Sequence, residues 1–401
     1  MQARERLGRA SRNRGSFLFG AGSVSGGFQP PDWSFDLPLM DAGAGKVQLT
    51  PTYAAGSPTP TFTRATAKWT KLSTGLWMEV ASGVAASCYL GADTAVGAYG
   101  GYFAEGAGTQ LVTPTASIRD MTDASWVKGA TMTAALTGTG IDGVANSCSR
   151  LTGGAVSATN TAFQTLTAAA SSRTYSVWLK RVTGTGTINI TQDGGVGYTD
   201  VTSQINSTTF TRVSLTASQL NAVFGIQVVT STDVILADFN QFEAGASATS
   251  PMAAAGAARN KDVLSYVLAG NISGVSGSFY AEVSSAVNSG VQGVGSSNTG
   301  GRMFYTSSGQ SIMFDGANAT ATPAITWTTS VQKVASSWGT SLKCFVGGTA
   351  GTSATFDGNM GFTGVLEVGD VAEVGPLFGC IRNYRIYSRA LTDAQLQAMT
   401  T

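Results

Sequence analysis

The segment Phe239-Asn-Gln-Phe-Glu-Ala-Gly-Ala-Ser-Ala-Thr-Ser-Pro251 separates a strand-like stretch from a run of small and polar residues. Residues 234–242 are rich in β-branched, aromatic and apolar side chains, as expected of a buried strand in a β-sandwich. Gly245 and Pro251 then supply residues that are typical of turns. The segment therefore predicts the end of one β-domain, and we expect residues 245–262 to lead into a second one.

Composition favours short strands over long helices along the whole chain. Only 12% of the 401 residues are charged, 51 are Gly, and hydrophobic residues at 43% provide enough apolar area for folded cores. Thr, Val, Ser and Gly suit short strands joined by tight turns, and long amphipathic patterns are hard to find. We predict an all-β fold with two β-sandwich (jelly-roll) domains in tandem and an extended N-terminal arm.

The sequence pattern changes at about residue 60 and again near residue 258. Residues 1–60 are rich in Gly and Pro with few periodic segments, which predicts a basic, extended assembly arm. Residues 61–258 contain regularly spaced strand-like runs and are assigned to the first sandwich. Within them, residues 175–180 alternate between apolar and mixed side chains, which predicts a strand with one apolar face. Residues 259–401 are assigned to the second sandwich.

Residues 1–14 carry the strongest charge asymmetry in the sequence. A single acidic residue lies among five arginines that are separated by small and polar residues: Arg4, Arg6, Arg9, Arg12 and Arg14. The pattern is typical of a flexible basic arm. A solvated tail, docking onto an acidic protein surface and contact with nucleic acid remain open as interpretations. The net charge of +1 gives no overall drive toward nucleic acid or anionic membranes, so we predict neither as a partner.

Trp33 and Phe35 belong to a short apolar cluster within the arm. Such a cluster either packs on the next domain of the same chain or inserts into a neighbouring subunit. We assign both residues, together with the five arginines, to anchoring on a larger assembly.

The absence of histidine excludes several kinds of chemistry. Imidazole metal sites and Ser-His-Asp or Cys-His catalysis cannot be built. The four cysteines are widely spaced, which favours buried free thiols over disulfides and offers no zinc motif. We predict no catalytic residues, no metal and no cofactor. No apolar run is long enough to span a bilayer, and no secretory segment is visible at the start, which predicts synthesis in the cytoplasm without membrane insertion.

The carboxylates that are close in sequence have plain structural interpretations. Asp120 and Asp123 precede Trp126 and are expected to cap a strand from a loop. Glu367, Asp370 and Glu373 alternate with valines, which predicts a turn at a solvated sheet edge.

Glu105 and Glu243 differ because both adjoin apolar or small strand residues. A partly buried carboxylate needs a cation, which Arg64, Arg259 or Arg212 can supply. We predict a structural staple of Arg64, Glu105, Glu243 and Arg259.

Six tryptophans supply aromatic surfaces of the kind that sugars stack on: Trp69, Trp77, Trp126, Trp178, Trp327 and Trp338. Core packing is the more common role of each of them, so we leave the glycan-binding residues unassigned.

Several segments, taken in order, resemble a β-sandwich domain that recurs in tailed-bacteriophage virion proteins. They are Phe62 to Thr66, Phe103 to Leu111, Asp123 to Trp126, and the opening segment followed by Arg259 and Asp262. The sequence departs from that family at Gln110, where Asn is usual, and at Ala104, where an aliphatic residue is usual. The resemblance implies a jelly-roll, carbohydrate-binding-module-like fold and a role in tail fibres or head decoration.

The C-terminal residues 379–396 resemble the closing strand and helix of concanavalin A-like, laminin-G-type sandwiches. Ile381, Tyr384 and Ile386 supply the strand, and Thr392 with Gln395 predicts a capping box that starts a short helix. The resemblance implies a second sandwich of this type.

These observations predict a non-enzymatic structural protein of a phage virion, synthesised in the host cytoplasm. We expect a tail-fibre or tail-associated component that contacts host surface glycans, attaches through its arm to other virion proteins and forms a homotrimer or another symmetric oligomer. One alternative is a capsid-decoration or head-fibre protein, whose basic arm would bind the acidic outer face of the capsid. Another is a polysaccharide depolymerase that uses two carboxylates.

Overall fold

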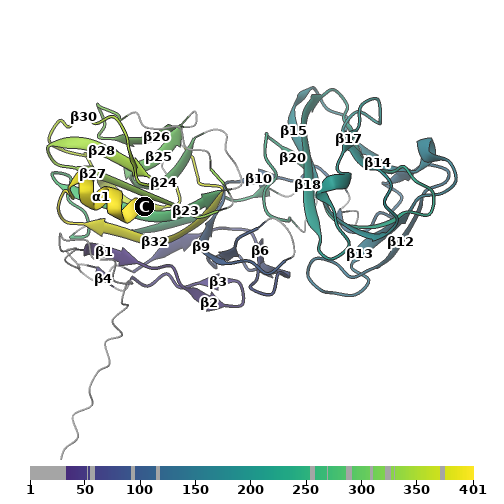
Figure 1. Cartoon of the computed structure of the whole chain (residues 1–401), viewed down its shortest axis with the longest axis horizontal. Coiled ribbons are helices and arrows are strands. Elements are labelled where there is room, and N and C mark those ends of the chain that lie inside the picture. The colour runs from purple at the N-terminus through teal and green to yellow at the C-terminus, as the bar shows by residue number, and fades with distance from the viewer. Residues whose placement is uncertain are drawn as a thin grey trace, which may run out of the picture. The chain divides into compact units, whose positions relative to one another are not determined.

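The computed structural model describes residues 33–51, 53, 54, 59–91, 95–113, 118–252, 258–268, 270–285, 291–307, 310–320, 327, 328, 330–370 and 375–401. Strands make up most of the regular structure (Figure 1), and the α-helix α1 (Asp393–Thr400) lies near the C-terminus. The all-β prediction is confirmed. Within the described ranges, no helix is long and apolar enough to cross a membrane.

One sandwich has the strand order of a jelly roll. Its strands are β11 (Val127–Lys128), β12 (Thr133–Gly138), β13 (Cys148–Thr152), β14 (Thr161–Thr165), β15 (Ser171–Thr183), β16 (Ile188–Thr191), β17 (Thr199–Asp200), β18 (Thr211–Gln219), β19 (Val223–Val228) and β20 (Val234–Ala244). They form two sheets, in the orders β12-β13-β20-β15-β18 and β11-β14-β19-β16-β17. Strands β13 to β20 thus switch repeatedly between the sheets, as in jelly rolls. Short 3-10 helices at Ser157–Thr159 and Thr202–Gln204 lie in its loops.

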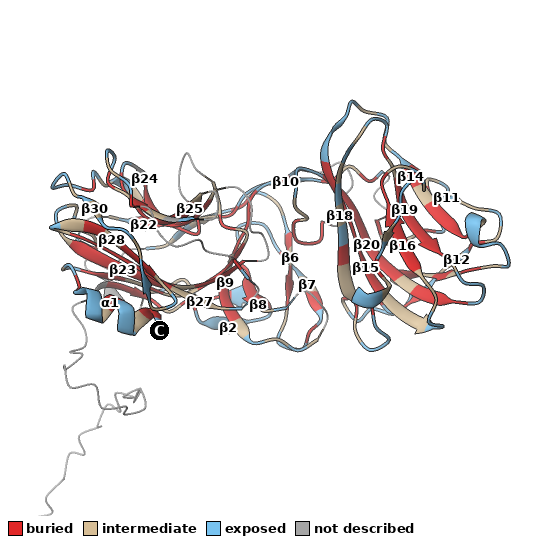
Figure 2. Cartoon of the chain, turned by 45° about the horizontal axis from the view of Figure 1, so that its top comes forward, coloured by how far each residue is buried: buried red, intermediate tan, exposed pale blue. Residues whose placement is uncertain are grey.

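The jelly-roll core is filled by the inward-facing residues of both sheets (Figure 2). Tyr175, Val177 and Leu179 of β15 are fully buried in it, which confirms the predicted apolar face. Phe242 of β20 stacks on Phe224 of β19 with ring centroids 4.2 Å apart. The opening segment therefore does end a buried strand.

The second sandwich is assembled from two separate parts of the chain, and we call it the discontinuous sandwich. Its larger sheet has the order β29-β28-β27-β23-β32-β1-β4, with β9 pairing to β32 and β8, and β30 pairing to β28. These strands are β1 (Trp33–Leu37), β4 (Tyr53–Ala54), β8 (Ser87–Tyr89), β9 (Tyr99–Ala104), β23 (Gly277–Ser285), β27 (Gln332–Trp338), β28 (Ser341–Val346), β29 (Thr349–Ala350), β30 (Ala354–Thr355) and β32 (Gly379–Tyr387).

The smaller sheet has the order β26-β25-β24-β31-β22-β5. Its strands are β5 (Thr61–Thr63), β22 (Val263–Val267), β24 (Gln292–Thr299), β25 (Arg302–Ser307), β26 (Gln310–Phe314) and β31 (Thr363–Val368). Residues of both sheets share one core, in which Phe279 of β23 meets Tyr384 of β32 with ring centroids 4.9 Å apart.

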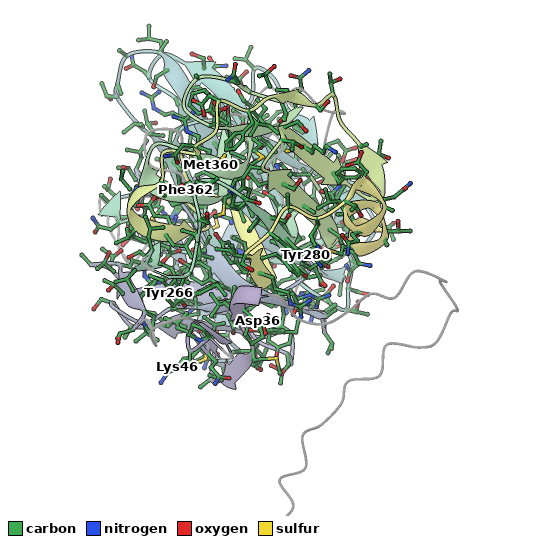
Figure 3. The ribbon with its side chains drawn as sticks, turned by 90° about the vertical axis from the view of Figure 1, so that its left-hand side faces the viewer. Asp36, Lys46, Tyr266, Tyr280, Met360 and Phe362 are labelled. Atoms are coloured by element: carbon green, nitrogen blue, oxygen red, sulfur yellow. A yellow bond between two sulfur atoms is a disulfide. The ribbon has the colours of Figure 1, made fainter. Side chains whose placement is uncertain are left out.

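The domain boundaries differ from those expected from sequence. Strand β1, which lies inside the expected arm of residues 1–60, pairs with β32. Asp36 of β1, labelled in Figure 3, accepts a hydrogen bond from Arg385 at 2.9 Å. Strands β5, β8 and β9 also belong to the discontinuous sandwich, although they lie within the range 61–258 assigned to the first. The jelly roll is thus inserted into the second sandwich. The expectation of tandem domains assumed that consecutive strands pair, whereas here strands pair across the insertion.

Three short ladders complete the described strands. The hairpin of β6 (Lys68–Lys71) and β7 (Trp77–Val80) lies between β5 and β8 in sequence. Strand β10 (Gly108–Thr109) pairs with β21 (Ala258–Arg259), so the two connections between the sandwiches run antiparallel. The third ladder joins β2 (Asp41–Gly43) to β3 (Lys46–Val47).

Helix α1 begins with the predicted capping box. Thr392 accepts from the backbone N–H of Gln395, and the Gln395 side chain accepts from the backbone N–H of Thr392. Leu396 is fully buried on the larger sheet.

The cysteines differ from the expectation of four free thiols. Cys88 of β8 and Cys380 of β32 form a disulfide, whereas Cys148 and Cys344 are buried free thiols. The disulfide joins residues 292 positions apart, and such a pairing cannot be deduced from cysteine spacing alone.

Candidate functional site

The outer face of the jelly-roll sheet positions an aromatic and a cationic side chain next to each other. Trp178 of β15 is the cross-strand partner of Arg212 of β18. Because side chains alternate along a strand, Trp178 points away from the core that holds Val177 and Leu179. It is nevertheless only 1% exposed, so other residues must cover it.

The β6–β7 hairpin provides that cover. Trp77 of β7 meets Trp178 edge to face, with ring centroids 5.0 Å apart, and its backbone N–H donates to the carbonyl of Ile141 at 2.9 Å. Trp69 of β6 packs in the same way on Phe239, at 4.7 Å. Phe239 has a φ of 43°, which is rare for an aromatic residue and interrupts the alternation of β20. This kink places Phe239 in the outer cluster with Trp77 and Trp178.

A cavity of about 430 Å³ lies beside these two tryptophans, and we call it the tryptophan cavity. Its lining includes Trp77, Trp178 and Arg212 together with Glu105. The exposed residues Ser214, Ala246 and Gly91 also line it, so the cavity is reached from solvent. Its volume lies within the range of roughly 300–1,000 Å³ that is usual for small-molecule sites.

Three hydrogen-bond donors of the lining residues lack an acceptor among the described residues. They are Nε1 of Trp77, Nε1 of Trp178 and Nε of Arg212. The other nitrogens of Arg212 are used, because they donate to the carbonyl of Thr249 and to Ser176 Oγ. A buried donor without an acceptor costs roughly 1–3 kcal/mol, so a ligand that accepts from these groups would recover that free energy.

A buried network of charges adjoins the cavity. Glu105 Oε2 lies 2.8 Å from Arg259 Nη1 and 3.4 Å from Lys68 Nζ. Asp262 joins the same network, with Oδ2 2.6 Å from Lys68 Nζ and Oδ1 2.8 Å from Arg64 Nη1. The side chains of Arg64 and Lys68 are fully buried, so their charges depend on these partners.

Glu243 forms a separate part of the network. It accepts hydrogen bonds from the backbone N–H of Thr249, at 3.0 Å, and from Gln241 Nε2, at 2.9 Å. Arg212 Nη2 lies 3.8 Å from Glu243 Oε2. Glu243 therefore fixes the segment that borders the tryptophan cavity.

The pKa shifts follow from burial and from these neighbours. Burial by itself would raise the pKa of Glu105, but the charges of Arg259 and Lys68 outweigh it and hold the pKa below its usual value. Burial dominates for Glu243, whose pKa is raised, and for Lys68, whose pKa is lowered despite Asp262 and Glu105. Burial also lowers the pKa of Arg212, although a guanidinium stays charged at neutral pH.

The structure brings together only part of the predicted staple. Arg259 does pair with Glu105, but Arg64 pairs with Asp262, and the cation closest to Glu243 is Arg212. Gln110, one of the two departures from the phage resemblance, is fully buried and accepts from the backbone N–H of Phe242 at 2.9 Å.

The structure corrects the anchoring role predicted for Phe35. Phe35 is fully buried against Tyr266 and Tyr384, so its side chain cannot insert into a neighbouring protein. Trp33 pairs through its backbone with Tyr387. The arginines lie outside the described residues: Arg4, Arg6, Arg9, Arg12 and Arg14.

Of the carboxylates that are close in sequence, one pair lies in a loop as predicted, and the described members of the other group are buried. Asp120 and Asp123 accept hydrogen bonds from Thr122 and Ser125, as expected of loop caps. The predicted solvated edge is wrong for Glu367, which is 8% exposed in β31, between β24 and β22. Asp370 is buried and pairs with Lys261 at 2.6 Å, and Glu373 lies outside the described residues. In the described ranges, no group of His, Cys, Asp and Glu has the arrangement of a metal site.

The sequence offers six tryptophans as aromatic surfaces but does not indicate which of them line a cavity. Trp126 and Trp338 are buried in the two main cores, as core packing predicts. The usable signal was the position of Trp178 on the mixed face of its strand. The sequence does not predict that Trp77 covers Trp178, because 101 positions separate the two residues.

No protein-family model and no curated protein matches the sequence. A carbohydrate-binding module, CBM40 of the Ruminococcus gnavus IT-sialidase bound to α2,3-sialyllactose, is 15% identical over 32% of this chain and 84% of its own, with a TM-score of 0.28. Domain 4 of AbnA, an arabinanase from Geobacillus stearothermophilus in complex with arabinotriose, is 18% identical over 35% of this chain and 73% of its own, with a TM-score of 0.29. The receptor-binding domain of botulinum neurotoxin mosaic serotype C/D is 15% identical over 34% of this chain and 39% of its own, with a TM-score of 0.26. Likenesses this remote assign no function to the chain.

Proposed function

We propose that this chain is a non-enzymatic, glycan-binding structural protein of a tailed-phage virion, most closely a tail-fibre or tail-associated component. The tryptophan cavity carries the glycan-binding part of the proposal. It combines two indole rings, Trp77 and Trp178, with polar groups that have no internal acceptor, which is the combination that sugar sites use. The virion part rests on the sequence resemblance, and a location in the virion, synthesis in the host cytoplasm and a homotrimeric state belong to the same proposal.

Binding without catalysis is favoured by the carboxylates near the cavity. Glycoside hydrolysis needs two carboxyl groups, one of them protonated near neutral pH. Glu105 is the one carboxylate among the described lining residues, and its pKa is lowered rather than raised. Glu243 has a raised pKa, but it does not line the cavity.

Replacing Trp77 by phenylalanine should weaken glycan binding about tenfold, because an aromatic ring, though a smaller one, remains while one hydrogen-bond donor is lost. Trp69→Phe is the matched control. Trp69 lies in the same hairpin and also has an indole N–H without an acceptor, but it does not line the cavity. We expect that variant to bind like the wild type.

Binding of both variants and the wild type to an array of bacterial surface polysaccharides measures this difference, and melting curves confirm that the variants are equally folded. Absence of binding by the wild type, or equal loss in both variants, would contradict the assignment.

Deleting residues 1–14 should prevent incorporation into virions while leaving binding to isolated polysaccharide unchanged. The deletion removes the five arginines and ends before the first described strand, β1, which begins at Trp33. Immunoblots of purified particles, with the glycan array as a folding control, measure the two effects. Normal incorporation of the truncated chain would exclude the arm as the anchor.

A further inference from the structure

We propose that the tryptophan cavity receives the carboxylate of an acidic sugar unit, so that the chain selects carboxylate-bearing polysaccharides over neutral ones. This inference rests on the proposed glycan-binding function and adds the chemical class of the ligand.

Of the described lining groups without a hydrogen-bond partner, three are donors, and the fourth, Glu105 Oε2, has Arg259 Nη1 2.8 Å away as its ion-pair partner. Trp77 Nε1, Trp178 Nε1 and Arg212 Nε each carry a hydrogen and cannot accept one. A sugar hydroxyl brings its own donor, which would also need an acceptor. A carboxylate only accepts, and its two oxygens together offer about four acceptor positions. It can therefore accept from such donors without bringing a donor of its own that would need an acceptor.

The charges that line the cavity favour an anion. Lys71 and Arg212 are the cations among the described lining residues, and Glu105 is the acid. Glu105 is paired with two cations, Arg259 and Lys68, and its charge together with that of Glu243 also acts on Arg212. Glu243 lies 3.8 Å from Arg212, which is too long for a hydrogen bond and leaves the Nε side of the guanidinium unused.

The burial of these donors makes the recognition strong. Trp178 is 1% exposed and Trp77 is 9% exposed, and their indole nitrogens have almost no accessible surface, so a ligand reaches them only by displacing the side chains that cover them. Hydrogen bonds from such sites to an ionised acceptor are stronger than neutral ones in water. The exposed residues Ser214 and Ala246 leave room for the rest of a polysaccharide to extend into solvent.

Isothermal titration with matched sugar pairs tests the inference on the wild-type protein. Oligosaccharides containing glucuronate, galacturonate or N-acetylneuraminate are each compared with the form in which the carboxyl group is reduced to an alcohol. We expect at least one acidic oligosaccharide to bind about tenfold or more tightly than its reduced partner, the loss expected when a charged hydrogen bond is removed.

Arg212→Lys should abolish most of that selectivity, because lysine keeps the charge but lacks the Nε–H. Arg181→Lys is the matched control: Arg181 lies in the same sheet, pairs with Asp233 at 3.1 Å and has a side chain 11% exposed, against 14% for Arg212, but it does not line the cavity. The control should retain wild-type selectivity.

Two results would overturn the inference, and they are distinguishable from failure of the proposed function. Equal affinity for acidic and reduced partners, with Trp77→Phe still weakening both, rejects the carboxylate but keeps a glycan site. Selectivity that survives Arg212→Lys rejects the assignment to this cavity. If the wild type binds no oligosaccharide and no polysaccharide of the array, the proposed function fails as well.

Discussion

Replacing Asp262 by asparagine should lower the free energy of unfolding by about 3–5 kcal/mol, because it leaves two buried cations without their counter-charge. Asp262 contacts Arg64 at 2.8 Å and Lys68 at 2.6 Å, and both cations have fully buried side chains. Among the described carboxylates, Lys68 keeps only its longer contact to Glu105, at 3.4 Å. Chemical denaturation of wild type and variant measures the difference.

Asp393→Asn is the control for this prediction. Asp393 also forms an ion pair, with Lys343, but its side chain is 63% exposed. Such a pair contributes less than about 1 kcal/mol. If Asp262→Asn destabilises the protein no more than Asp393→Asn, the buried network is not what holds the connections between the sandwiches.

Loss of the Cys88–Cys380 disulfide should cost about 2–5 kcal/mol of stability. The bond joins β8 to β32 across 292 residues, so the unfolded chain gains much conformational freedom when it is absent. We expect the double variant Cys88→Ala/Cys380→Ala to unfold at lower denaturant concentration than the oxidised wild type.

Reduced wild-type protein provides the control, since it lacks the bond but keeps both side chains. Its stability should fall to nearly that of the double variant. Equal stability of the wild type with and without reductant would show that the bond does not contribute.

Local sequence patterns predicted the local structure well. The alternation of Tyr175, Val177 and Leu179 identified β15, and Thr392 with Gln395 identified the start of α1. In both cases the decisive interactions lie within a few residues of each other, or depend only on which side of a strand faces the core.

Non-local pairing was not predictable in the same way. Phe35 of β1 pairs with Ile386, and Cys88 bonds to Cys380, across an inserted jelly roll. Neither residue carries a local signal of its distant partner. The positive φ of Phe239, which turns its side chain to the outer cluster, is also not predictable from sequence, because nothing in its side chain favours a positive φ.

The candidate site contains one ion pair that the sequence suggests and one cavity that it does not. Arg259 was among the three arginines expected to supply a cation for Glu105 or Glu243, because a carboxylate beside apolar residues needs one, and it pairs with Glu105. The tryptophan cavity was not predictable, since it requires Trp77 from one hairpin, Trp178 from a strand of the jelly roll and Arg212 from the next strand of the same sheet.

The most direct test of the account is a crystal structure of the protein soaked with the acidic oligosaccharide that binds most tightly. We predict density for one sugar unit in the tryptophan cavity, with its carboxylate within hydrogen-bond distance of Arg212 Nε and of at least one indole N–H, from Trp77 or Trp178. A sugar bound elsewhere, with the cavity filled only by solvent, would contradict the account.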